Sequence, residues 1–474
     1  MFHRILIFTS IMSKLATFVR YWIFLVPCPI FFSCSTQKQI GRSAKSSVFA
    51  DSTIKNALIG ISIYDAASGK YLYSHNADKY FVPASNTKII TCYAGLKYLG
   101  DSLAGIRYQE TADAIIITPT GDPTLLHPDY PKQPVIDFLK RANKPLKIID
   151  TVWKSDDLGS GWSWDDFNNY YMAERSPLPV YGNILRWTQE RGEGKPEDSL
   201  SFDESVSIYS IPEINWKVNF KPDPPRTFYV QRDRADNIYT ISEGRETKRT
   251  QDVPFVTHGL QSALELLKDT IGKEIQLAIG IPIAIGRQLA NEPQTPNAKL
   301  QTVYSQLLDS MLRPMMHRSD NFFAEQTLMM VSQVLLGYMD DSRAASRVIN
   351  EDLKGIPQRP RWADGSGLSR FNLFTPQDFI FILNKMQAEF GMPRMRNIFP
   401  TGGRGTISNY YKSDSGYIFA KTGSLSGVIC ISGYLYTRKN KLLIFSVLVN
   451  NHYGNTTSIR RSVERFITGV RQRY

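Results

Sequence analysis

One stretch of the chain sets the expected fold, and it reads Phe81-Val82-Pro83-Ala84-Ser85-Asn86-Thr87-Lys88-Ile89-Ile90. Proline is tolerated at the start of a helix, because an N–H group there has no acceptor within the helix and its absence costs no hydrogen bond. Apolar residues then recur at roughly helical spacing as far as Leu99. The stretch therefore predicts a largely buried helix that begins beside Ser85.

Ser85 and Lys88 are three residues apart, so on a helix their side chains share one face. The positive end of the helix dipole and an apolar surrounding both lower the pKa of the lysine, toward a value at which it accepts a proton. A serine activated by such a lysine is a known nucleophile. The spacing alone is not specific, because residues 35–38 and 52–55 share it, and a helix cap followed by a solvated lysine is the alternative.

The length, composition and net charge limit which classes of protein the chain can belong to. The 474 residues are 42% hydrophobic and 21% charged, which indicates a folded chain of two or three domains. The net charge is +12, but the basic residues are dispersed and form no zinc finger, recognition helix or Arg/Gly tract. We therefore expect contact with an anionic cell surface or wall polymer, and no nucleic-acid partner.

The first 34 residues are predicted to be an export signal. Residues 21–32 are apolar but too short to span a bilayer comfortably, and they follow Lys14 and Arg20. Cys34 and its neighbours resemble a bacterial lipoprotein processing site, which implies membrane attachment through a lipidated Cys34. We expect a periplasmic protein in which the polar residues 35–50 form a tether.

Two further segments offer polar side chains in the right setting for chemistry. Ser319-Asp320-Asn321 lies in a short gap between predicted helices, so Ser319 and Asn321 can face one cleft, although these residue types also cap helices. Lys421-Thr422-Gly423-Ser424 ends a predicted strand, where the lysine offers a fixed positive charge and the threonine a hydroxyl. Gly423 would let an extended peptide lie along the strand edge, and a plain turn is the alternative.

The spacing of the remaining residues places the other elements. Strands are expected at Ile59–Tyr64 and at Leu442–Asn450, and helical spacing runs from Val303 to Met316. Asp364 to Ser369 is glycine-rich but matches no phosphate-binding spacing, so a structural turn is predicted. Without the first 34 residues only two cysteines remain, both in apolar runs, which excludes a disulfide framework.

The ordered set of motifs is more specific than any one of them. Ser85-x-x-Lys88, Ser319-Asp320-Asn321 and Lys421-Thr422-Gly423 form the triple of penicillin-binding proteins and class A β-lactamases. The long gap between the first two motifs argues for inserted domains. The chain resembles the class C low-molecular-mass penicillin-binding proteins, the D-alanyl-D-alanine carboxypeptidase/endopeptidase family also called peptidase family S13. Further segments carry this resemblance: Gly121–Leu125, Trp162–Asp166, Ser176–Leu178, Asp364–Ser369 and Gly402–Thr406.

The resemblance implies an α+β fold. Its catalytic part is a transpeptidase-like domain of the penicillin-binding-protein/serine β-lactamase type, with a five-stranded antiparallel sheet flanked by helices and two smaller, β-rich domains inserted. The expected division is a catalytic domain of residues 51–105 and 292–474, an inserted domain II of 106–181 and 251–291, and a nested domain III of 182–250.

The resemblance also implies a serine-type D-alanyl-D-alanine carboxypeptidase that acts on peptidoglycan stem peptides ending in D-Ala-D-Ala, and also a DD-endopeptidase. The catalytic residues would be Ser85 as nucleophile, Lys88 as its base, and Ser319 with Lys421 as the pair that returns a proton to the leaving amine. The substrate-binding residues would be Asn321, Thr422, Gly423 and Ser424. β-Lactam antibiotics would inhibit it covalently, and no cofactor or metal is required.

Three alternatives remain beside this function. A secreted serine β-lactamase shares the motif triple but needs efficient deacylation, and the long insertion is out of place in it. A penicillin-binding wall sensor would acylate without turnover. A Ser-His-Asp esterase is disfavoured, because no Gly-x-Ser-x-Gly occurs in the chain.

Overall fold

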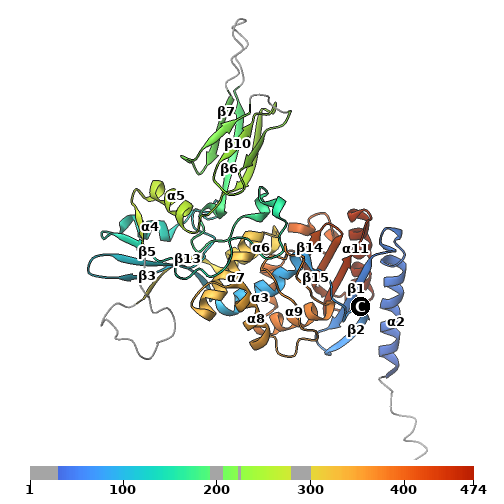
Figure 1. Ribbon diagram of the computed structural model, residues 1–474. Coiled ribbons are helices and arrows are strands. Elements are labelled where there is room, and N and C mark those ends of the chain that lie inside the picture. The colour runs from blue at the N-terminus through green and yellow to red at the C-terminus, as the bar shows by residue number, and fades with distance from the viewer. Residues whose placement is uncertain (1–29, 193–205, 222–225, 279–299) are drawn as a thin grey trace, which may run out of the picture.

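A computed structural model describes residues 30–192, 206–221, 226–278 and 300–474 (Figure 1). Most of the predicted export signal lies outside these residues. Among the helices of the described segments, none combines the length with the apolar character that crossing a membrane requires.

The larger body is built on a five-stranded sheet in which strands from the N-terminal and C-terminal parts of the chain pair with each other. Its order is β14-β15-β16-β1-β2, and every neighbouring pair is antiparallel. Ile61 lies opposite Val447, so the predicted strands at residues 59–64 and 442–450 belong to one sheet. The strands are β14 (Ile418–Leu425), β15 (Val428–Tyr436), β16 (Leu442–Asn450), β1 (Leu58–Asp65) and β2 (Lys70–His75).

Helices cover both faces of this sheet, which explains its unbroken apolar runs. In β16 every residue after the first is buried, as expected for a strand whose two faces are both covered. One face packs on α2 (Ile30–Ser47) and α11 (Thr456–Arg473). The other carries a helical layer of α3 (Lys88–Tyr98), α6 (Leu308–His317), α7 (Asn321–Leu336), α8 (Asp341–Glu351), α9 (Pro376–Phe390) and α10 (Met392–Ile398) (Figure 1).

Three further sheets lie in the described residues. A mixed sheet of order β12-β5-β4-β3-β13 packs with α4 (Pro134–Arg141) and α5 (Gln261–Ile271). Two three-stranded sheets, β11-β6-β7 and β8-β10-β9, form the lobe at the top of Figure 1. Their strands are β3 (Ser102–Glu110), β4 (Ile115–Pro119), β5 (Leu146–Ile148), β6 (Ile184–Arg191), β7 (Val206–Ile211), β8 (Val218–Phe220), β9 (Tyr229–Arg232), β10 (Tyr239–Ser242), β11 (Lys248–Pro254), β12 (Ile275–Leu277) and β13 (Gln301–Leu307).

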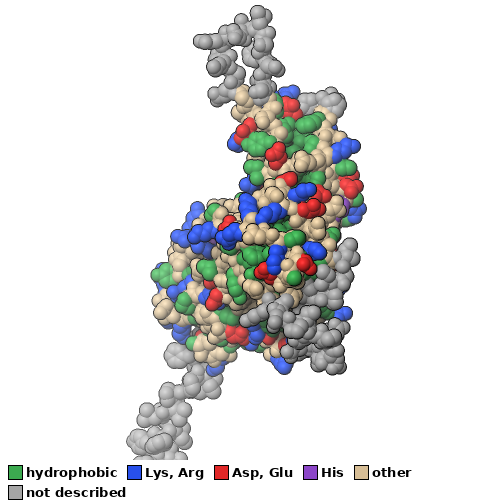
Figure 2. Space-filling view, turned by 90° about the vertical axis from the view of Figure 1, so that its left-hand side faces the viewer, with side chains coloured by type: hydrophobic (Ala, Val, Ile, Leu, Met, Phe, Trp, Pro, Cys, Tyr) green, Lys and Arg blue, Asp and Glu red, His purple; other side chains and the backbone are tan. Residues whose placement is uncertain are grey.

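The predicted fold class is confirmed, with a five-stranded antiparallel sheet between helices and additional β-rich sheets. Figure 2 shows the upper lobe projecting from the larger body, with Lys/Arg and Asp/Glu side chains interspersed on the visible face. The domain boundaries stay a prediction.

Two local expectations were wrong. The helical spacing from Val303 begins as a strand, because β13 pairs with β3, and α6 starts only at Leu308. Most of the expected tether at 35–50 is instead part of helix α2. Ile40 and Ala44 of α2 are buried in the same hydrophobic cluster as residues of α11. In both cases a distant partner supplies the packing that decides the structure.

Candidate active site

The nucleophile motif lies where the chain enters the helical layer. Residues Ala84–Thr87 form a 3₁₀ turn, with Ala84 at φ +48°, and the α-helix begins at Lys88 rather than at Ser85. The Lys88 ammonium is fully buried and donates to Ser85 Oγ at 3.2 Å. The expected juxtaposition of the serine and the lysine is therefore present.

Two more acceptors hold Lys88 in place. Its Nζ lies 2.7 Å from Asn321 Oδ1 and 2.7 Å from the carbonyl oxygen of Ser366. Burial lowers the pKa of Lys88 from 10.5 to about 8, although the negative charges of Asp364 and Glu325 oppose the shift. A lysine with this pKa can take a proton from a hydroxyl near neutral pH.

Ser319 and Lys421 form the second pair. Lys421 Nζ donates to Ser319 Oγ at 2.8 Å and to the carbonyl oxygen of Thr422 at 2.6 Å. Burial, followed by the nearby positive charge of Lys88, holds the pKa of Lys421 well below 10.5. A permanently charged Lys421 is therefore disfavoured, and the geometry suits a lysine that exchanges its proton with Ser319.

The polar residues at the start of α7 have different roles: one caps the helix and the others contact the two buried lysines. Asp320 caps the helix by accepting from the N–H of Phe323 at 3.0 Å, so helix capping accounts for this residue. Ser319 has φ +63° and lies beside Lys421 instead. Asn321 binds Lys88 through its oxygen and donates one N–H to the carbonyl of Tyr171 at 2.9 Å, which leaves its second N–H for a ligand.

Gly423 lines the smaller cavity beside Ser85, and the structure adds a second reason for a glycine there. A Cβ at this position would lie 2.6 Å from the carbonyl oxygen of Pro83 and 3.0 Å from the backbone nitrogen of Ser85. The absence of a side chain lets β14 approach the nucleophile turn itself. This close approach brings Thr422 and Ser424, on the same strand, to the cavities beside Ser85.

The glycine-rich segment 364–369 is a structural turn, as predicted, and it also completes the site. Asp364 accepts from the N–H groups of Gly367 at 2.8 Å and Ser369 at 2.6 Å. A Cβ on Gly367 would lie only 2.0 Å from the carbonyl oxygen of Ala84, so the turn packs directly against the nucleophile segment. The packing explains how the Ser366 carbonyl reaches Lys88.

Glu325 is a site residue that the sequence motifs did not indicate. Its carboxylate accepts from the N–H of Ser366 at 2.7 Å and lies 3.5 Å from the guanidinium of Arg175. Burial and the charge of Asp364 raise the pKa of Glu325 to about 7. It sits one α-helical turn beyond Asn321, but nothing local to that spacing distinguishes it from other helix residues.

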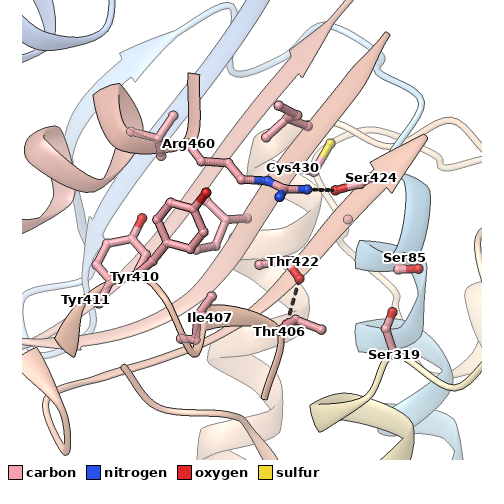
Figure 3. A pocket seen from close by; sticks show the side chains of 14 residues that line it. Ser85, Ser319, Thr406, Ile407, Tyr410, Tyr411, Thr422, Ser424, Cys430 and Arg460 are labelled. Carbon is pink, nitrogen blue, oxygen red and sulfur yellow. Dashed lines mark hydrogen bonds between the residues drawn. The ribbon is translucent and has the colours of Figure 1, made fainter. Parts of the chain in front are cut away.

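Two cavities meet at Ser85. The first, about 310 Å³, is lined by Thr422, Thr406 and Arg460, and Thr422 Oγ1 donates to Thr406 Oγ1 at 2.8 Å (Figure 3). The second, about 600 Å³, is lined by Asn321, Arg370 and Asp166, among others. Ser85 and Ser424 line both cavities, so Ser85 lies between the two arms of one groove.

Across the described parts of the chain, no cluster of three or more His, Cys, Asp or Glu side chains could hold a metal ion. The site itself brings together two serines and two buried lysines. These groups define a serine acyl-transfer enzyme of the penicillin-binding type.

Comparison with known proteins identifies the family. Residues 43–470 match the D-Ala-D-Ala carboxypeptidase 3 (S13) family, and the chain belongs to it. It is 25% identical to a D-alanyl-D-alanine carboxypeptidase of Actinomadura sp. (strain R39), over 87% of this chain and 81% of that protein. It is 24% identical to D-alanyl-D-alanine carboxypeptidase DacB of Haemophilus influenzae, over 83% of this chain and 85% of that protein.

A solved structure shares the fold. Penicillin binding protein 4 (dacB) from Haemophilus influenzae matches with a TM-score of 0.67 at 20% identity, over 90% of this chain and 97% of that one. A second structure of that protein, complexed with a novel β-lactam, matches with a TM-score of 0.61. The predicted family and class, a serine-type D-Ala-D-Ala carboxypeptidase, are thus confirmed.

Proposed function

We propose that this carboxypeptidase cleaves peptidoglycan stem peptides through an acyl-enzyme on Ser85. The observation that carries the proposal is the buried Lys88, whose Nζ lies 3.2 Å from Ser85 Oγ and whose pKa is lowered to about 8. Neutral Lys88 takes the Ser85 proton while Oγ attacks the carbonyl carbon of the penultimate D-alanine. The backbone N–H groups of Ser85 and Ser424 would stabilise the resulting oxyanion, each by about 3–4 kcal/mol.

The second pair would complete the first half of the reaction. The 2.8 Å contact between Lys421 Nζ and Ser319 Oγ supports a relay that delivers a proton to the leaving nitrogen. The C–N bond then breaks, D-alanine leaves as the free amino acid, and an ester remains on Ser85. Water attacks this ester, the proton it loses returns through the same groups, and the free serine is restored.

The two arms of the groove would hold the two sides of the scissile bond. Asn321 and Ser424 line the larger arm, which would take the acyl chain, and Asp166 and Arg370 present charges of both signs to it. A stem peptide that carries both carboxylate and amino groups suits that pairing. Thr422 lines the smaller arm, where its hydroxyl would bind the carboxylate of the leaving residue.

We also propose that β-lactams acylate Ser85, that cross-linked peptides are substrates, and that the chain is exported to the periplasm. A β-lactam that enters the same groove presents its strained amide to Ser85 and a carboxylate to Thr422. The signal segment of residues 1–34 and lipidation of Cys34 stay predictions, and the mass of the N-terminal peptide from cells tests both.

The decisive experiment is mass analysis of purified peptidoglycan incubated with the enzyme. We expect loss of terminal D-alanine from pentapeptides, and cleavage of cross-linked dimers would add endopeptidase activity. Rapid, sustained hydrolysis of penicillin without D-alanine release would instead indicate a β-lactamase. A stable penicillin adduct with no peptide cleavage would indicate a sensor. The Ser85→Ala variant serves as the inactive control.

A further inference from the structure

The smaller arm of the groove offers more than the binding of D-alanine requires. Its volume of about 310 Å³ lies at the lower end of the range for small-molecule sites, roughly 300–1,000 Å³. Beyond Thr422 its wall is apolar and aromatic, and consists of Ile407, Tyr410, Tyr411, Ile429, Ile431 and Val463. The methyl side chain of D-alanine would leave most of this wall uncovered.

Arg460 supplies the one charged side chain of this lining, which contains no Asp or Glu. It belongs to α11, and its Nη2 donates to Ser424 Oγ at 2.9 Å. Figure 3 shows the guanidinium reaching from the helix toward β14, on the side where Ser424 lies. The cation is therefore directed into the groove rather than away from it.

The charge of Arg460 is unbalanced within the described residues, where no carboxylate pairs with it. Two other arginines of α11 are paired with carboxylates. Arg461 lies 2.6 Å from Glu464, and Arg471 lies 3.0 Å from Asp414. A guanidinium that lines a cavity without an anionic partner is suited to an anionic ligand, because its fork of N–H donors matches a carboxylate.

The geometry also places this cation on the correct side of the nucleophile. Thr422 and Ser424 are two apart on β14, so both side chains point to one face of the strand. Gly423 between them faces the Pro83 turn. A carboxylate held at Thr422 therefore lies in the same stretch of groove as Ser424. The Arg460 guanidinium, which donates to Ser424 Oγ, lies in that stretch as well.

We propose that this cavity is the subsite for the leaving residue, in which Arg460 binds the C-terminal carboxylate and the apolar wall accommodates a large side chain. The inference rests on the proposed cleavage at Ser85 and names its second substrate class. The enzyme releases D-amino acids with aliphatic or aromatic side chains as well as D-alanine. A pocket fitted to a methyl group would instead reject each added methylene by about tenfold or more.

The role of Arg460 is tested with a peptide ending in D-Ala-D-Ala and with its C-terminal amide. In Arg460→Gln we expect kcat/KM for the free acid to fall about tenfold to a hundredfold, because a hydrogen bond to a charged group is lost. The amide should change little, and Arg460→Lys should restore part of the loss. Arg465→Gln, the matched control on the same helix, should leave both substrates unchanged, because Arg465 is exposed and donates to Ser462 Oγ, which is not part of the cavity lining.

The size of the subsite is tested with the unmodified enzyme and peptides ending in D-Ala-D-Leu and D-Ala-D-Phe. We expect kcat/KM for both to equal or exceed that for D-Ala-D-Ala. A loss of about tenfold or more for both peptides would show a pocket fitted to the methyl group and overturn the subsite.

Different results would contradict the proposed cleavage at Ser85 and the assignment of Arg460. If the parent enzyme releases no D-alanine and penicillin does not label Ser85, the proposed function is wrong. If the parent is active but Arg460→Gln keeps the full preference for the free acid over the amide, the function stands and the assignment of Arg460 is wrong.

Discussion

Lys88 Nζ lies 3.2 Å from Ser85 Oγ, and Ser85 lines a groove that the chain assembles from segments far apart in the sequence, while Lys88 itself is fully buried behind it. No histidine takes part in this pair. The ammonium is held by Asn321 and by the Ser366 carbonyl, which orient it while burial weakens its hold on the proton. The pairing supports the proposal that Ser85 is the nucleophile, and several measurements test it.

Labelled penicillin should attach to Ser85 alone. We expect Ser85→Ala to abolish both the label and D-alanine release, because no other serine hydroxyl contacts Lys88 within the described residues. Mass analysis of the labelled peptide locates the adduct. Ser68→Ala, in the exposed turn between β1 and β2, is the control and should label normally. An adduct on any other serine would contradict the assignment.

The rate of acylation should rise with pH up to about 8 and then level off. Only neutral Lys88 accepts the Ser85 proton, so below its pKa of about 8 each pH unit should raise kcat/KM close to tenfold. Lys88→Arg should be inactive at every pH, since a guanidinium keeps its proton. A rate that is flat between pH 6 and 8 in the parent enzyme would argue against Lys88 as the base.

The hydroxyl of Thr422 should contribute more to D-alanine release than the hydroxyl of Thr406, with which it forms a hydrogen bond. Thr422→Val removes a hydrogen bond to a charged group, which is worth about 1.5–3 kcal/mol, or roughly tenfold to a hundredfold in kcat/KM. The Thr422 hydroxyl has one proton, which it donates to Thr406 Oγ1 in the free enzyme and would turn to a bound carboxylate. Thr406→Val leaves that proton available, so it should cost about tenfold at most. D-Alanine release from a pentapeptide measures both. If Thr422→Val stays within about twofold of the parent, the hydroxyl does not bind the carboxylate.

Glu325 should make the fold less stable as the pH rises. Its pKa is about 7 in the folded chain and near 4.5 when exposed, so between these values the folded state holds a proton that the unfolded state has lost. Stability from this group is therefore present at low pH and is lost as the pH rises toward 7. Glu325→Gln should flatten this decline, and thermal unfolding of both proteins at pH 5 and pH 8 measures it. Equal slopes would contradict the prediction.

Gly423→Ala should inactivate the enzyme and lower its melting temperature. The added Cβ would lie 2.6 Å from the Pro83 carbonyl oxygen, so β14 must move away from the Ser85 turn. Gly41→Ala in α2, where the new Cβ meets only an ordinary contact at 3.4 Å, is the matched control and should retain activity. Normal acylation by Gly423→Ala would show that the approach of β14 to the turn is not required.

The sequence by itself determined those features that depend only on neighbouring residues, such as helical spacing and the hydrophobicity of a strand. The three-residue spacing of Ser85 and Lys88 places both on one face of a helical turn, whatever surrounds them. The long apolar runs of β15 and β16 predict strands covered on both faces. A strand with one face in water would alternate polar and apolar residues, and these strands do not. Together with the order of the three motifs, these features were enough for the fold class and the family.

Tertiary structure alone decided which groups complete the site. The sequence marks the segments 364–369 and 402–406, but not that the Ser366 carbonyl meets Lys88 or that Thr406 meets Thr422. Glu325 and Arg460 belong to no motif, and only the fold brings Glu325 to Ser366 and Arg460 to Ser424. The same holds for α2, which is a polar sequence overall yet buries Ile40 and Ala44 against a partner hundreds of residues away. Hydrogen bonds and burial depend on which surfaces meet in space, and the periodicity of one segment carries no information about the surface it will meet.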